Sequence, residues 1–249
     1  MEILTRTASS EEIALAVRTS GPVTEKPVLL VHGMGGDHHT WRPLARALRT
    51  AGRTVISYDQ RGHGRSSRSP SYLLNDFRDD LGFLLDRLGV EQVDVVGHSL
   101  GGQTALRLAM STPERIGKLV LEEIPPMPRT QADLDENIAP FTGIADRVRG
   151  VWSVARYPGP VLRFDHRMSV VVTRQFDAVD TSWWDALSLI TFPTLVISGG
   201  DRSFLPPRHL QSLTEALPRG DYFQIDAGHS VHRDRPDEFN RQVLDFLRV

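Results

Sequence analysis

Short apolar runs alternate with amphipathic stretches along most of this chain. The runs carry Val, Leu and Ile on both faces, which is typical of strands buried in a parallel sheet. They predict strands at 28–31, 54–58, 93–96, 119–121, 194–198 and 222–225. Between them, apolar residues recur at helical spacing. This second pattern predicts helices at 40–51, 73–88, 100–111, 207–217 and 236–247.

Two further segments, 3–7 and 13–18, have the pattern of a leading antiparallel strand pair. Strands and helices in alternation indicate an α/β fold with a doubly wound, mostly parallel sheet, here of eight strands. In such sheets ligands bind at the carboxyl ends of the strands. We therefore look for the functional residues directly after each predicted strand.

One region interrupts the alternation. Residues 125–190 are punctuated by prolines and hold three of the four tryptophans, Trp152, Trp183 and Trp184. A long stretch without sheet signals inside a compact domain is usually a lid or a functional insertion. Since 249 residues approach the upper size of one hydrophobic core, we expect a single core formed by 1–124 and 191–249, with a helical cap inserted at 125–190.

Composition narrows the range of functions. The net charge of −2 gives no basic footprint for nucleic acid or for an anionic membrane. The absence of cysteine excludes disulfides, thiolate metal sites and a cysteine nucleophile. Without a signal-peptide pattern at 1–7 or an apolar run of transmembrane length, we expect a cytoplasmic monomer or homodimer that acts on a small molecule.

The segment Gly97-His98-Ser99-Leu100-Gly101 joins a predicted strand to a predicted helix. In a G-x-S-x-G elbow the glycines let the backbone turn sharply, so that the serine hydroxyl is presented at the strand end. The free N–H groups of the following helix point at the same place, where an oxyanion can be stabilised. The alternative is an ordinary turn in which serine caps the helix.

The glycine-rich segment 32–36 follows another predicted strand. There the N–H of Met34, together with that of Leu100, is a candidate oxyanion hole, and the alternative is a plain glycine turn. A dinucleotide fingerprint is a rival interpretation, because Asp59 ends the next strand. It fails because His38 stands where a third glycine is needed for close packing.

An acid and a histidine each follow a later strand. Asp201 comes after 194–198 and His229 after 222–225, in the chain order Ser, Asp, His that a hydrolase elbow requires. Histidine takes the serine proton, and the acid fixes its tautomer. Glu122 and Glu123, at the end of 119–121, are alternatives for the acid. Several other residues are expected to stay outside the chemistry. His98 should pack into the protein, and His232 should lie beside the site or on the surface. The remaining ones are the loop residues His38, His39 and Asp59–Ser66.

In these motifs the chain resembles the α/β-hydrolase superfamily, in its serine-nucleophile branch with a helical cap. The resemblance covers nearly the whole chain through His32–Gly36, Asp59–Ser66, Gly97–Gly101, Gly200–Asp201 and Gly228–His229. It implies a nucleophile at Ser99, a base at His229, an acid at Asp201 and oxyanion donors at Met34 and Leu100. It implies neither a cofactor nor a metal.

The expected reaction is hydrolysis of a carboxylic ester with a hydrophobic part. Candidate substrate contacts are Gly33, His98, Met127, Phe141, Trp152, Phe164, Trp183 and Trp184. The apolar residues among them have an alternative role as the cap's own core. Thioester, lactone or C–C bond hydrolysis and perhydrolase or lyase chemistry use the same groups. A non-catalytic ligand-binding protein on this fold is the alternative of a different class.

Overall fold

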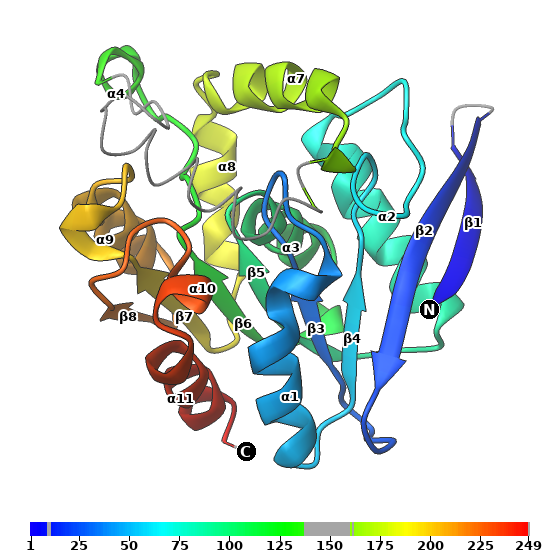
Figure 1. Cartoon of the computed structure of the whole chain (residues 1–249). Coiled ribbons are helices and arrows are strands. Elements are labelled where there is room, and N and C mark those ends of the chain that lie inside the picture. The colour runs from blue at the N-terminus through cyan, green and yellow to red at the C-terminus, as the bar shows by residue number, and fades with distance from the viewer. Residues whose placement is uncertain (9–10, 137–159, 161, 249) are drawn as a thin grey trace.

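A computed structural model describes residues 1–8, 11–136, 160 and 162–248, and its centre is one eight-stranded sheet (Figure 1). The spatial order of the strands is β1-β2-β4-β3-β5-β6-β7-β8. Their bounds are Glu2–Ala8 (β1), Glu11–Ser20 (β2), Val28–Val31 (β3), Val55–Tyr58 (β4), Val93–His98 (β5), Ile116–Glu122 (β6), Thr194–Ser198 (β7) and Gly220–Gln224 (β8). The sequence prediction of all eight is confirmed, with shifts at the ends.

Only the first strands run antiparallel. β1 pairs with β2, and β2 with β4, in antiparallel register, whereas every pairing from β4 through β3 to β8 is parallel. His98 lies opposite Glu122, and Glu122 lies opposite Ile197. The loops that follow β5, β6 and β7 therefore leave from the same edge of the sheet.

Helices cover both faces of the sheet. α1 (Arg42–Thr50) and α11 (Pro236–Leu247) lie on one face, and α2 (Leu74–Arg87), α3 (Leu100–Ser111) and α9 (Pro207–Ala216) lie on the other (Figure 1). Strand β3 explains the unbroken apolar runs, because Leu29 and Val31 face one hydrophobic cluster while Val28 and Leu30 face the other. A strand buried on both sides has no solvent face to make polar.

The segment 125–190 forms helices in its described part. They are α4 (Gln131–Asp135), α7 (His166–Phe176) and α8 (Thr181–Ala186), and α7 lies across the top of the molecule in Figure 1. At the start of the segment the Gln103 side-chain amide donates to the Pro125 carbonyl at 2.6 Å. At its far side, Asp165 N–H donates to the Gly62 carbonyl at 2.8 Å. The segment is thus fastened to the core at both places, while its function as a cap stays a prediction.

The helices of this fold were compared with the requirements for spanning a membrane. Among the described residues, none of the helices combines the length and the apolar character that crossing a bilayer requires.

Candidate active site

Ser99 lies at the tip of the turn between β5 and α3, with strained backbone angles of φ 51° and ψ −116°. A Cβ on Gly97 would lie 2.7 Å from the Gly101 carbonyl oxygen, and a Cβ on Gly101 would lie 2.2 Å from that of Val31. Only glycine fits at either position. Strain of this kind persists where the surroundings enforce it, typically at active sites, so the predicted elbow geometry is present.

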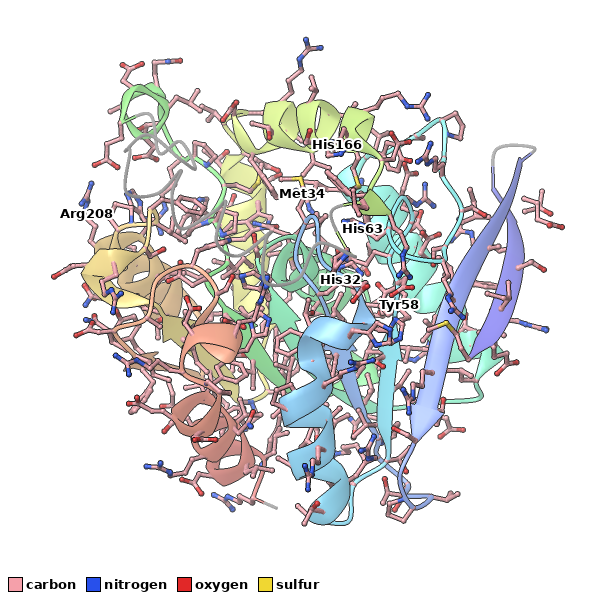
Figure 2. The ribbon with its side chains drawn as sticks, viewed as in Figure 1. His32, Met34, Tyr58, His63, His166 and Arg208 are labelled. Carbon is pink, nitrogen blue, oxygen red and sulfur yellow. The ribbon has the colours of Figure 1, made fainter. Side chains whose placement is uncertain are left out.

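The loop after β3 carries Met34, whose N–H has no hydrogen-bond acceptor within the described part of the chain. The loop is held on both sides. His63 Nε2 accepts from the Gly35 N–H at 3.1 Å, and the Gly33 carbonyl oxygen lies 2.8 Å from His32 Nδ1. Figure 2 shows Met34 near His32 and His63, below α7. Leu100 begins α3, where an N–H has no intrahelical partner.

His229 pairs with a carboxylate from the residue that follows β6. Its Nδ1 lies 3.1 Å from Oε2 of Glu123, a residue with no exposed surface. Since an ionised carboxylate can only accept, Nδ1 carries the proton and Nε2 presents a lone pair. The His229 side chain keeps 25% of its surface exposed. This is the arrangement that a histidine base needs.

The Glu123 carboxylate is also held from β7 and the turn after it. The Gly199 N–H donates to Oε1, and the Ser203 hydroxyl donates to Oε2. Glu123 has a left-handed backbone with φ 49°, and its N–H donates to the Ile197 carbonyl at 3.0 Å. At this edge two adjacent strands are therefore each followed by a strained non-glycine residue, Ser99 after β5 and Glu123 after β6.

The prediction that Asp201 is the acid partner of His229 is wrong in this structure. Asp201 is exposed and lies in a short 3-10 turn, Gly200–Arg202. Gly200 begins the turn with φ 70°, which sends Asp201 outward and brings the Ser203 hydroxyl to the acid site. Of the alternatives named from the sequence, Glu123 takes the place next to His229.

His98 contacts the backbone at His229 instead of facing a substrate. Its Nε2 lies 2.7 Å from the His229 carbonyl oxygen, and the two rings are 4.8 Å apart between centroids. A carbonyl only accepts, so Nε2 carries the proton. Burial lowers the pKa of His98 to about 3, which keeps this ring neutral. Because His98 precedes Ser99 directly, the contact brings the elbow and the histidine loop together.

A second glutamate–histidine pair lies beside the first. The carboxylate of Glu122 accepts from both the N–H and the Nδ1 of His232, at 2.9 Å and 2.8 Å. His232 is on α10 (Val231–Asp234), a helix that the sequence did not indicate. Burial raises the pKa of Glu122 to about 7 and lowers that of His232 to about 3. Two places were predicted for His232, beside the site or on the surface. The structure shows the first: His232 lies beside the site and is buried.

The loop after β4 has the supporting role that its sequence predicts. Asp59 accepts from the N–H and Nδ1 of His38 at 2.8 Å and 2.7 Å, and from the Arg65 N–H at 3.0 Å. Burial alone would raise the pKa of Asp59, but the hydrogen bonds from His38 and Arg65 outweigh it and bring the pKa to about 2. Asp59 is therefore a structural carboxylate.

Most of the predicted substrate contacts that the structure describes are packed into the protein. Met127, Phe164 and Trp183 are buried in the hydrophobic cluster that also contains α2 and α3. Trp184 donates through Nε1 to the Met127 carbonyl at 2.7 Å, and the Arg129 guanidinium lies over its ring. These contacts favour the alternative that the residues form the segment's own core. Phe141 and Trp152 lie outside the described residues.

Ser203 and the Gly199 N–H were missed from the sequence, and the choice among the acids was open. A signal did exist, because two consecutive glutamates follow the apolar run of β6, directly before Ile124 and Pro125. Glutamate is seldom fully buried unless it is paired, so two of them at a buried strand end indicate partners there. Over the described ranges, no group of three or more His, Asp or Glu residues is arranged to hold a metal ion.

Comparison with known proteins agrees with the fold. A family model of the α/β hydrolase fold matches residues 26–150. The chain is 30% identical over 257 residues to the sn-1-specific diacylglycerol lipase ABHD11 of Mus musculus, covering 91% of this chain and 82% of that protein. It is 31% identical over 256 residues to the putative carbamate hydrolase RutD of Variovorax paradoxus (strain S110), covering 91% and 93%.

Among solved structures, a hydrolase from Pseudomonas aeruginosa PA01 superimposes with a TM-score of 0.80 at 29% identity, covering 99% of this chain and 98% of that one. The likeness thus spans the whole sheet and both helical layers. The chain belongs to the α/β-hydrolase fold family and is a hydrolytic enzyme of that family.

Proposed function

We propose that this hydrolase cleaves carboxylic esters that have an apolar part, through an acyl-enzyme formed on Ser99. The observation that carries the proposal is the His229–Glu123 contact at 3.1 Å next to the strained elbow of Ser99. It supplies a base with a free Nε2, an acid that fixes its tautomer, and a nucleophile on a turn that exposes the hydroxyl.

In the first half of the proposed reaction, His229 Nε2 takes the Ser99 proton while Oγ attacks the ester carbonyl carbon. The carbonyl electron pair moves to oxygen, and the N–H groups of Met34 and Leu100 stabilise that oxyanion. The imidazolium is stabilised by Glu123, which the Gly199 N–H and the Ser203 hydroxyl hold in place. Collapse of the intermediate breaks the C–O bond, and His229 gives its proton to the departing alcohol.

In the second half, a water molecule attacks the acyl carbon after losing a proton to His229. The Ser99 oxygen leaves and regains a proton from the same ring, which releases the acid and restores the enzyme. Names of relatives support an acyl substrate, since one is a diacylglycerol lipase and another a putative carbamate hydrolase. The lipase among them supports the ester that we propose for this chain.

The test is covalent labelling followed by turnover. A fluorophosphonate probe should add one phosphonyl group to the Ser99 peptide, and Ser99→Ala should abolish it. We expect p-nitrophenyl esters of increasing acyl length to be hydrolysed faster than a matched p-nitrophenyl carbamate. A folded protein that neither labels nor turns over any ester would overturn the proposal in favour of a non-catalytic binding protein.

A further inference from the structure

The Glu122–His232 pair has no part in the proposed chemistry, although it repeats the composition of the pair that does. Glu122 has no exposed surface, and the His232 side chain is 4% exposed. Within the described residues, His232 Nε2 has no hydrogen-bond partner. The ring lies against Trp41 at 4.3 Å between centroids. A ring sealed in this way cannot exchange a proton with a substrate.

Glu122 is bonded at both of its ends to the two halves of the site. Its main-chain carbonyl accepts from the Ser99 N–H at 2.9 Å. Its carboxylate accepts from the N–H and the ring of His232, three residues beyond His229. One residue thus joins the nucleophile's backbone to the helix that begins just after the base.

His98 makes the reciprocal connection. It precedes Ser99, and its Nε2 donates to the carbonyl of His229 at 2.7 Å. The rings of His98 and His232 lie 5.0 Å apart between centroids, so the two connections also pack against each other. Together they fix the histidine loop relative to the elbow in two directions, whereas the Glu123 contact fixes only the ring of His229.

We propose that Glu122 and His232 are positioning residues that hold the His229 loop at working distance from Ser99. We call the pair the Glu122–His232 brace. The inference rests on the proposed function, because it assumes that His229 serves Ser99. Displacing a catalytic group by about an ångström from its reaction partner is enough to lower the rate on the order of 10²-fold. The brace should therefore act on kcat and leave substrate binding nearly unchanged.

Two substitutions at the same position separate positioning from mere stability. His232→Asn keeps an N–H donor near the place of Nδ1 but leaves a gap beside Trp41. His232→Leu fills that apolar gap, but its side chain cannot donate to Glu122, which keeps only the bond from the main-chain N–H. We expect His232→Asn to retain kcat within about threefold and His232→Leu to lose about 30-fold or more, with KM within twofold in both, while the leucine variant has the higher melting temperature.

Two controls complete the experiment. Leu48→Ala removes a side chain from the cluster that contains Trp41 and should lower the melting temperature with no loss of kcat. Glu122→Asp withdraws the carboxylate by one methylene and should lower kcat about tenfold, which tests the brace if His232→Leu does not fold.

The outcomes are distinguishable. The brace is disproved if kcat of the His232 variants follows their melting temperatures, or if His232→Leu and Glu122→Asp both stay within twofold of the wild type. In either case, labelling of Ser99 that disappears in Ser99→Ala would leave the proposed function intact. Full turnover by Ser99→Ala would instead overturn the proposed function itself.

Discussion

Two consecutive glutamates at the end of β6, one in the strand and one just past it, pair with two histidines three residues apart, and the two pairs have different surroundings. Glu123 stands just past the strand with a left-handed backbone, and its partner His229 keeps 25% of its side-chain surface exposed. Glu122 still belongs to the strand, and its partner His232 keeps 4%. The same two side chains can thus form a reacting pair or a sealed structural pair, depending on access to solvent and substrate.

The backbone at the strand end explains the difference. Glu122 is the last residue of β6, whereas Glu123 lies just past it in a left-handed conformation, so the two side chains leave the backbone in different directions and meet different histidines. The short helix α10 places His232 over one glutamate while the preceding turn places His229 over the other.

The largest expected effect comes from removing the Ser99 hydroxyl, the nucleophile that the His229–Glu123 pair is proposed to serve. Ser99→Ala should lower kcat for an activated ester by about 10⁶-fold, because the serine, histidine and acid act as a unit. Melting temperature should not fall, since the Ser99 side chain makes no hydrogen bond among the described residues. Steady-state hydrolysis of p-nitrophenyl acetate, with protein freed of wild-type contamination, measures the loss. A drop below tenfold would remove the basis for calling His229 a reacting residue.

The choice of acid gives the next effect. Glu123→Gln should lower kcat about 10³- to 10⁴-fold, because a neutral amide neither holds the Nδ1–H tautomer nor balances the imidazolium. Asp201→Asn, at the exposed position, should stay within about twofold. Kinetics of the two variants under identical conditions decide between the acids, and the reverse order of losses would restore Asp201 to the site.

The sealed pair should appear instead in the pH dependence of stability. Burial raises the pKa of Glu122 to about 7 from its ordinary value of 4.5, so between these two values the folded protein holds a proton that the unfolded chain releases. The Glu122 contribution to stability is therefore unaffected by pH below 4.5, becomes increasingly unfavourable as the pH rises from 4.5 through 7, and levels off above that at about 3 kcal/mol.

Glu122→Gln removes this titration. Urea unfolding of both proteins from pH 5 to pH 8 should show the wild type losing stability relative to the glutamine variant as the pH rises. Parallel pH profiles would mean that Glu122 is ionised in the folded protein throughout that range.

The smallest expected effect on kcat comes from removing the Ser203 hydroxyl, a donor to the His229–Glu123 pair. The Ser203 hydroxyl donates to Glu123 Oε2, the oxygen that also faces His229. Hydrogen bonds to charged groups contribute about 1.5 kcal/mol or more, so Ser203→Ala should lower kcat about tenfold. Ser203→Thr keeps the hydroxyl and should recover most of the rate. Equal kcat for the alanine variant and the wild type would show that the Gly199 N–H suffices.

Much of the fold follows from patterns that the sequence carries openly. Apolar runs buried on both faces locate the sheet strands, and the helical stripes locate α1, α2, α3, α9 and α11. The short helix α10 escapes, because four residues contain too little periodicity to register. The helices of 125–190 escape for another reason: on α7 the exposed Val170 and Val171 lie next to the buried Met168 and Val172, which obscures the apolar stripe.

The site was predictable as far as backbone punctuation goes. Glycines mark the elbow of Ser99 and the turn before His229, and both are where the sequence indicates. The acid depends instead on where a turn directs its side chain. The left-handed Gly200 turns Asp201 to solvent, and the left-handed Glu123 turns inward. Local sequence does not decide between two acids at neighbouring strand ends, because the answer lies in contacts across strands.

The bond from Gln103 to the Pro125 carbonyl has a practical consequence for remodelling this protein. It holds the chain in place two residues beyond Glu123, so changes further along the segment 125–190 need not move the acid. Exchanging residues 127–190 for the matching stretch of another hydrolase should leave the contact between Glu123 and His229 unchanged. If the segment acts as the predicted cap, substrate range can then be changed without moving the reacting groups.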